Sequence, residues 1–113
     1  MTEDKLEAIF RMQKFFADQL QANGKFPYPR EVAVEKLCTA MSHEVHELQR
    51  LTGWKWWKTQ TKPMDEYEAK EELIDIFHFV IHAAIVLGLT ADDFLRVYEQ
   101  KMEINKKRQK EGY

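Results

Sequence analysis

Apolar residues recur at intervals of three and four along most of the chain, which is the spacing of one face of an α-helix. The clearest row advances by 3, 4, 4 and 3 through Val34, Leu37, Met41, Val45 and Leu48. Gly and Pro interrupt helices, and they are concentrated in the short stretches NGKFPYP, LTGW, TKP and LGLT. The pattern therefore predicts four helices: one that ends before residue 24, and three over residues 30–51, 65–87 and 91 onward.

The predicted helices carry end signals of their own. Asp65 precedes a Glu-rich turn and suits an N-cap. Thr90 with Asp93 forms a capping-box pattern, and Gly88 ends the helix before it. No segment alternates apolar and polar residues in the way that predicts a strand. The expected fold is all-α: a single domain over residues 1–113, folded as an antiparallel four-helix bundle.

The third predicted helix is apolar on nearly every side between Ile74 and Leu89, apart from Asp75 and two histidines. A helix that is apolar all round is buried all round. In a four-helix domain of 113 residues, one helix has too few neighbours to be covered completely. We therefore predict that dimerisation completes the bundle, giving a homodimer or a larger homo-oligomer.

Composition and charge narrow the class of protein. A net charge of −2 argues against a protein that coats nucleic acid through general electrostatic attraction. Cys38 is the single cysteine, which excludes an internal disulfide and fits a reducing compartment. The start, MTEDKLEAIF, carries acids where a signal peptide carries bases, and the longest apolar run, residues 76–89, is too short for a bilayer. We expect a cytoplasmic protein that binds neither nucleic acid nor membranes.

Two pairs of acidic residues lie close to apolar positions. Glu44 and Glu47 lie on a stripe that borders the apolar face of the second helix. Glu72 and Asp75 occur where the third helix becomes apolar. Carboxylates near a core are protonated, paired with a cation or bound to a metal, and a cage of such oxygens selects Mg²⁺ or Mn²⁺. The alternative is a set of ion pairs with the basic residues Arg50, Lys70 or Arg11.

These acids belong to a longer pattern. ExxE occurs as Glu44-Val-His-Glu47 and ExxD as Glu72-Leu-Ile-Asp75, which resembles the metal signature of the all-α nucleoside triphosphate pyrophosphohydrolase (MazG-like) superfamily. The segments LQRLTGWKWWK and ELIDIFHF are similar to its dimeric dUTPase branch, and so is the end of the chain, KMEINKKRQKEGY. The three blocks occur in the family's order over roughly residues 40–113, so together they are more specific than any one of them.

The resemblance implies an activity and a metal site. The expected reaction is Mg²⁺-dependent hydrolysis of dUTP, and also of dUDP, to dUMP, with Mn²⁺ as a possible substitute. The four acids named above would hold the metals, and Glu47 would activate the attacking water. Two alternatives remain: a house-cleaning pyrophosphohydrolase for dCTP or modified nucleotides, and a non-catalytic metal-binding helical dimer.

The resemblance also implies a set of substrate-binding residues. The stretch GWKWWK offers aromatic faces for a base and lysines for phosphates, although these tryptophans could instead form a hydrophobic plug over the end of the bundle. The family usually pairs a Gln with a nearby Asn on the first helix, but residues 15–17 here are Phe, Phe and Ala. His78, three residues after Asp75, is expected to orient that acid. The expected contacts to a deoxynucleoside di- or triphosphate are Gln13, Trp54, Lys55, Trp57, Lys58, Lys101, Asn105, Arg108 and Tyr113.

Overall fold

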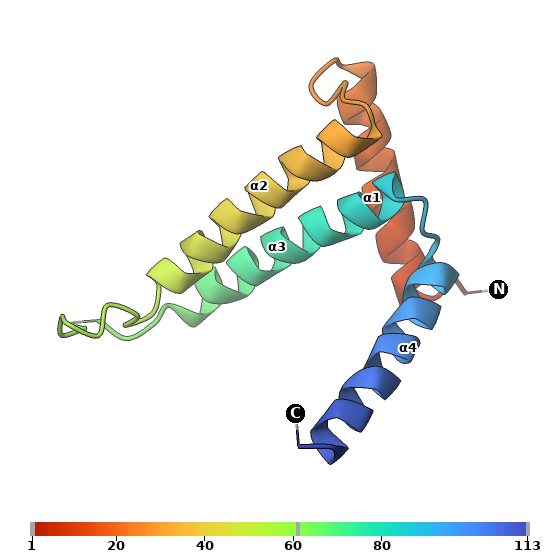
Figure 1. The fold of residues 1–113 in the computed structure, drawn as a ribbon. Helices are drawn as coiled ribbons and strands as arrows, with labels where there is room; N and C mark the ends of the chain where they lie inside the picture. The colour runs from red at the N-terminus through yellow and green to blue at the C-terminus, as the bar shows by residue number, and fades with distance from the viewer. Residues whose placement is uncertain (1, 61, 113) are drawn as a thin grey trace.

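The computed structural model describes residues 2–60 and 62–112, and all its regular elements are helices within these ranges (Figure 1). The predicted all-α class and the number of helices are therefore confirmed. The expected contact Tyr113 lies outside the described residues. The four helices are α1 (Lys5–Ala22), α2 (Arg30–Arg50), α3 (Glu66–Val86) and α4 (Ala91–Lys110).

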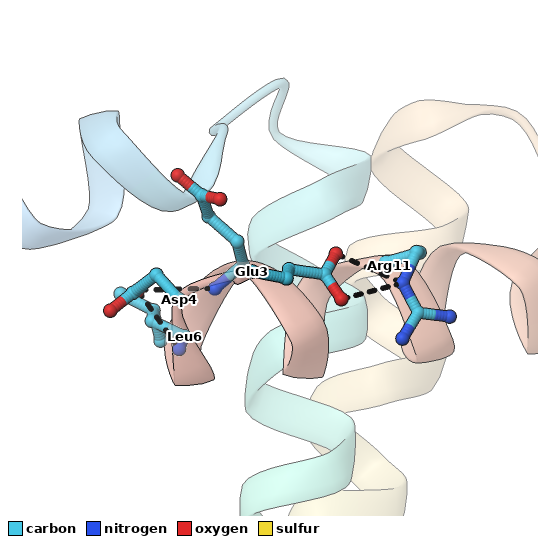
Figure 2. A network of polar contacts seen from close by, with 5 residues as sticks. Glu3, Asp4, Leu6 and Arg11 are labelled. Carbon is cyan, nitrogen blue, oxygen red and sulfur yellow. Dashed lines mark hydrogen bonds and ion pairs between the residues drawn. The ribbon is translucent and has the colours of Figure 1, made fainter. Parts of the chain in front are cut away.

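The helix ends follow local chemistry. Asp65 caps α3 by accepting a hydrogen bond from the Glu68 amide at 3.0 Å, as predicted. The predicted capping box of α4 also forms, with two bonds of 3.1 Å between Thr90 and Asp93. The N-cap of α1 is Asp4, which accepts from the amides of the first turn, beside an ion pair between Arg11 and Glu3 (Figure 2). Each cap satisfies backbone donors that have no partner inside the helix.

Helices α2 and α3 lie side by side as an antiparallel pair, joined by the loop that holds the three tryptophans (Figure 1). Helix α1 crosses near the C-terminal end of α3. At that junction Phe10 of α1 packs with Ile81 of α3 and Ala91 of α4, and the Phe10 and Phe94 ring centroids are 5.6 Å apart. Arg30 ties the start of α2 to the same junction through a 3.3 Å bond to the Leu87 carbonyl.

Helix α4 leaves this junction at an angle of 107° to α3 (Figure 1). Gly88, with φ of 82°, permits the turn, because side chains other than glycine's disfavour that backbone conformation. A backbone hydrogen bond also stabilises this turn: the Leu89 amide donates to the Ala84 carbonyl at 2.9 Å. In the described ranges no single helix is long and apolar enough to cross a membrane, and α3 with α4 passes that test only as this bent pair.

The hydrophobic core of the single chain is small. Among the described residues seven hydrophobic side chains are buried, and four of them are alanines. The radius of gyration is 17.5 Å, whereas a compact domain of this length has about 13 Å. The expectation that α3 is buried on every side is not met within one chain, because Leu73 and Ile74 are 55% and 63% exposed.

Candidate functional site

Three of the four predicted metal ligands lie together in the half of the α2–α3 pair nearer the connecting loop. Glu44 of α2 and Glu72 and Asp75 of α3 each offer an oxygen within 4.8 Å of the others. The i,i+3 spacing aligns the two α3 acids, and the antiparallel packing brings Glu44 opposite them. Oxygens bound to one Mg²⁺ at about 2.1 Å lie up to about 4.2 Å apart, so small rotations of these side chains suffice to bind an ion.

Partial burial and neighbouring negative charge both raise the pKa of Glu72. Burial raises the pKa of the Glu72 carboxyl, and a hydrogen bond and negative charge from Glu44 raise this pKa further. The charges of Asp75 and Glu47 add to the effect. Every one of these charged groups is a carboxylate, so a bound divalent cation would relieve their mutual repulsion. The donor set therefore fits a hard divalent metal.

Glu47 takes a different position from the other three acids. Its carboxylate forms an ion pair with Arg50, one turn further along α2. It is close enough for its charge to raise the pKa of Glu72, but it does not belong to the three-acid cluster. Glu47 thus forms one of the ion pairs that the alternative offered, whereas Arg11 pairs with Glu3 instead. Asp75 was expected to be surrounded by apolar side chains, but it is exposed in the single chain.

A cavity of about 490 Å³ lies between α1 and α3, and its link to the cluster is His78, which lines the cavity and is close enough to Asp75 for that charge to act on its pKa. Its lining is apolar except for Gln13 and His78. Gln13 is only 7% exposed, and its Nε2 has no hydrogen-bond partner. A buried N–H donor without a partner is costly, and a ligand carbonyl in the cavity would satisfy it. The apolar lining consists of Ile9, Met12, Phe16, Ile74, Phe77 and Ile81.

His78 is the second polar group of this cavity. Its ring packs edge-on against Phe16 of α1, with centroids 5.4 Å apart, and against Phe79. Burial lowers the pKa of the His78 imidazole, and the charge of Asp75 offsets only part of this. At neutral pH His78 is therefore a neutral group with one donor and one acceptor nitrogen. The sequence pointed to its proximity to Asp75 but not to its place in the cavity.

The tryptophan loop lies at the end of the α2–α3 pair away from α1 (Figure 1). Trp54 and Trp57 pack edge to face at 5.8 Å, and the Lys55 ammonium is 5.6 Å from the Trp54 ring centroid. Lys58 lines a separate cavity of about 580 Å³ together with Asp65. The structure thus places these four predicted contacts beyond the acidic cluster, and none of them lines the Gln13 cavity.

The predicted contacts from the tail lie on α4, apart from Tyr113. Lys101, Asn105 and Arg108 are all exposed. Because α4 diverges from α3 by 107°, a rise of about 1.5 Å per residue leaves Lys101 on the order of 20 Å from Asp75. This is further than a lysine side chain reaches. The structure therefore does not bring Lys101 to the acidic cluster of its own chain.

The raised pKa of Glu72 predicts a signature in stability. Folded, metal-free protein binds this proton more tightly than the unfolded chain, so ionisation of Glu72 costs stability as pH rises above its ordinary pKa of 4.5. Glu72→Gln should match the wild type in Tm below about pH 4 and exceed it near pH 7 with chelator present, whereas saturating Mg²⁺ should reverse the order. Thermal unfolding over this pH range, with chelator and with Mg²⁺, measures both Tm differences. The histidines are present in both proteins, so their titration does not contribute to the differences. A Tm difference that is independent of pH would contradict the expectation.

Comparison with known proteins identifies the family. Residues 5–87 match the family described as dUTPase. The chain is 37% identical over 71 residues to the dCTP pyrophosphatase of Enterobacteria phage T4, and 39% identical over 71 residues to that of phage LZ5. These alignments cover 53% of this chain and 42% and 41% of the two relatives. A DNA replication protein of phage T4 is 36% identical over 59 residues, which are 42% of this chain and 15% of that protein.

The family match covers most of the chain and includes both acidic pairs. The chain therefore belongs to the all-α nucleoside triphosphate pyrophosphohydrolase superfamily. Within it, the chain is a member of the dUTPase family. It spans about two fifths of the length of the phage dCTP pyrophosphatases that it matches. No solved structure matches the chain.

Proposed function

We propose that the protein hydrolyses a pyrimidine deoxynucleoside triphosphate, dUTP in the first instance and also dUDP, to the monophosphate with Mg²⁺ or Mn²⁺. One observation carries the proposal: the same stretch of α3 contributes Asp75 to a carboxylate cluster and Ile74 and His78 to an apolar cavity that contains a buried, unpaired amide. A nucleotide has the complementary chemistry, with phosphates at one end and a flat base edged with carbonyls at the other. The three acids would hold a divalent ion whose charge would offset that of the phosphates, and the cavity would take the base.

The chain's own groups have separate roles in this mechanism. Glu44, Glu72 and Asp75 would hold the metal, which neutralises phosphate charge and lowers the pKa of a bound water. Glu47 would accept the proton of the attacking water, which requires its carboxylate to exchange its ion pair with Arg50. Gln13 would donate its Nε2 proton to a base carbonyl, while the apolar lining excludes water from the base.

A second substrate is favoured by a separate observation. The phage relatives are named dCTP pyrophosphatases, and uracil and cytosine both carry the carbonyl that Gln13 would bind. Cytosine differs from uracil at two neighbouring ring positions, where donors and acceptors are exchanged. His78 can supply either a donor or an acceptor there, so the cavity is compatible with dCTP as well.

The test is turnover of a nucleotide panel with Mg²⁺. We expect release of pyrophosphate from dUTP or dCTP at a kcat/KM at least about tenfold above that for dATP and dGTP, since a pocket fitted to one base discriminates by about 1–3 kcal/mol. Phosphate release from dUDP separates the two candidates, because it is the reaction proposed with dUTP. Equal turnover of all four deoxynucleotides would remove the assignment of the cavity to the base, and no turnover at all would remove the enzymatic proposal.

A further inference from the structure

A second cavity, of about 250 Å³, lies between α1, the start of α2 and the C-terminal end of α3. It shares no lining residue with the Gln13 cavity. Sites for drug-sized ligands usually have about 300–1,000 Å³, so the smaller volume suits a molecule smaller than a nucleotide. Its charged lining residues are Lys14, Asp18 and Arg30, and its aromatic ones are Phe26, Tyr28 and His82.

His82 is a buried polar group in the wall of this cavity, and it is only 4% exposed. Its ring contacts Phe26, with centroids 4.9 Å apart, but forms no hydrogen bond to any of the described residues. Burial lowers the pKa of the His82 imidazole, and the charge of His78 lowers it further. The neutral ring keeps one N–H donor, and a buried donor without a partner is costly. A hydrogen-bond acceptor in the cavity would remove that cost.

Two cations line the cavity, and one acid faces them. The Lys14 ammonium is 2.6 Å from an Asp18 carboxylate oxygen, so these two charges offset each other. The Arg30 guanidinium donates to the Leu87 carbonyl at 3.3 Å and forms no ion pair with the described residues. A guanidinium has five N–H donors, so most of those of Arg30 are left for a ligand. The wall of the cavity therefore carries an excess of positive charge.

The start of α2 adds to this positive charge. Its N-cap is Pro29, whose side chain makes no capping hydrogen bond. The first amides of a helix have no acceptor within the helix, and the aligned peptide dipoles place partial positive charge there. Arg30 and Ala33 bring this first turn into the wall of the cavity, whereas Glu31, the acid of the turn, does not line it. An anion is the ligand that such a helix start favours.

We propose that this cavity binds a small oxyanion of the phosphate class, held by Arg30, by the buried N–H donor of His82 and by the first turn of α2. The site is separate from the acidic cluster, which shares no residue with it. The inference therefore does not depend on the proposed function. Because the wall contains parts of α1, α2 and α3, a bound anion would also favour the packed arrangement of these helices.

The decisive experiment is a titration of the whole, metal-free chain with inorganic phosphate, with chloride adjusted to keep the ionic strength constant. NMR follows the ring protons of the histidines, and His82→Phe assigns the signal of His82. We expect this signal to shift with phosphate until it saturates, while those of His43 and His46, which are exposed on α2, stay in place. An unmoved His82 signal, or the same shift at all three histidines, would overturn the inference.

Two variants test the groups that would hold the anion. Arg30→Gln and His82→Phe should each weaken phosphate binding by about 10-fold to 100-fold, because each removes a hydrogen bond to a charged group. The amide signal of Ala33, in the cavity wall, measures the affinity in every variant. Arg11→Gln is the control, since it removes the same charge from an exposed position of α1 outside the cavity. Folded variants that all bind phosphate as the wild type does would overturn the site.

Thermal unfolding gives a further test that needs no nucleotide. Phosphate stabilises folded proteins in general by its exclusion from their surface, and this effect should be the same in the wild type and in Arg30→Gln. A specific site adds stabilisation that depends on phosphate affinity. We therefore expect phosphate to raise the Tm of the wild type and of Arg11→Gln more than that of Arg30→Gln. Equal rises in all three would contradict the inference, whatever the chain hydrolyses.

Discussion

Replacement of Glu72 by glutamine is expected to lower kcat/KM for the nucleotide substrate by about 100-fold to 10,000-fold, the range by which a positioned acid–base or metal-bound water contributes to hydrolysis. Glu72 is the member of the cluster on which burial, Glu44, Asp75 and Glu47 all act, so it lies at the centre of the negative charge. Glutamine keeps the shape of the side chain but removes its charge. Steady-state kinetics with increasing Mg²⁺ measures the loss, which should be accompanied by weaker binding of the metal.

The control for this variant is Glu66→Gln. Glu66 carries the same charge on the same helix, in the exposed first turn of α3 and outside the acidic cluster. Its replacement should leave kcat/KM unchanged within about twofold. If Glu72→Gln and Glu66→Gln were equally active with their folds intact, the acidic cluster would have no part in the reaction.

The variant Gln13→Leu should separate folding from substrate binding. Leucine fits the apolar cavity and removes the unpaired Nε2, so Tm should stay the same or rise. A hydrogen bond from Gln13 to a base carbonyl would be lost, which at about 1–3 kcal/mol corresponds to a fall of about 10-fold to 100-fold in kcat/KM. The effect should fall mainly on KM, because the base is remote from the phosphorus under attack. Kinetics and thermal unfolding on the same preparation measure both quantities.

Gln19→Leu makes the same substitution at an exposed position of α1. It should alter neither KM nor kcat. A Gln13→Leu protein that turns over dUTP and dCTP as the wild type does would show that the base binds elsewhere, with the tryptophan loop as the next place to examine. A Gln13→Leu protein of lower Tm would show instead that the amide contributes to the fold.

The features that the sequence predicted well are those that depend on residues close together in the chain. Helix bounds follow from the three-and-four spacing and from end signals such as Asp65 and Thr90, each of which acts within one turn. The acidic cluster could also be predicted, because i,i+3 pairs are local and a short connection makes neighbouring helices antiparallel. Even within this cluster, the sequence did not indicate which of the candidate basic residues would form an ion pair with Glu47, and in the structure it is Arg50.

The features that it missed depend on how distant segments pack. The cavity requires α1 to cross α3 at one particular height, and the apolar spacing of Ile9, Met12 and Phe16 fixes only which side of α1 faces inward. Gln13 entered the prediction through family resemblance, and nothing in its neighbours signalled an unpaired buried amide. The direction of α4 could not be predicted from the sequence either, because a helix has the same apolar periodicity whether it packs against its own chain or points away from it.

The joint between α3 and α4 has a consequence for the direction of α4. Its geometry depends on Gly88, on the hydrogen bond from the Leu89 amide to the Ala84 carbonyl and on the cap at Thr90, all within one short stretch of chain. The outward course of α4 is therefore set at the start of the helix, and the residues beyond its first turn have no part in setting it.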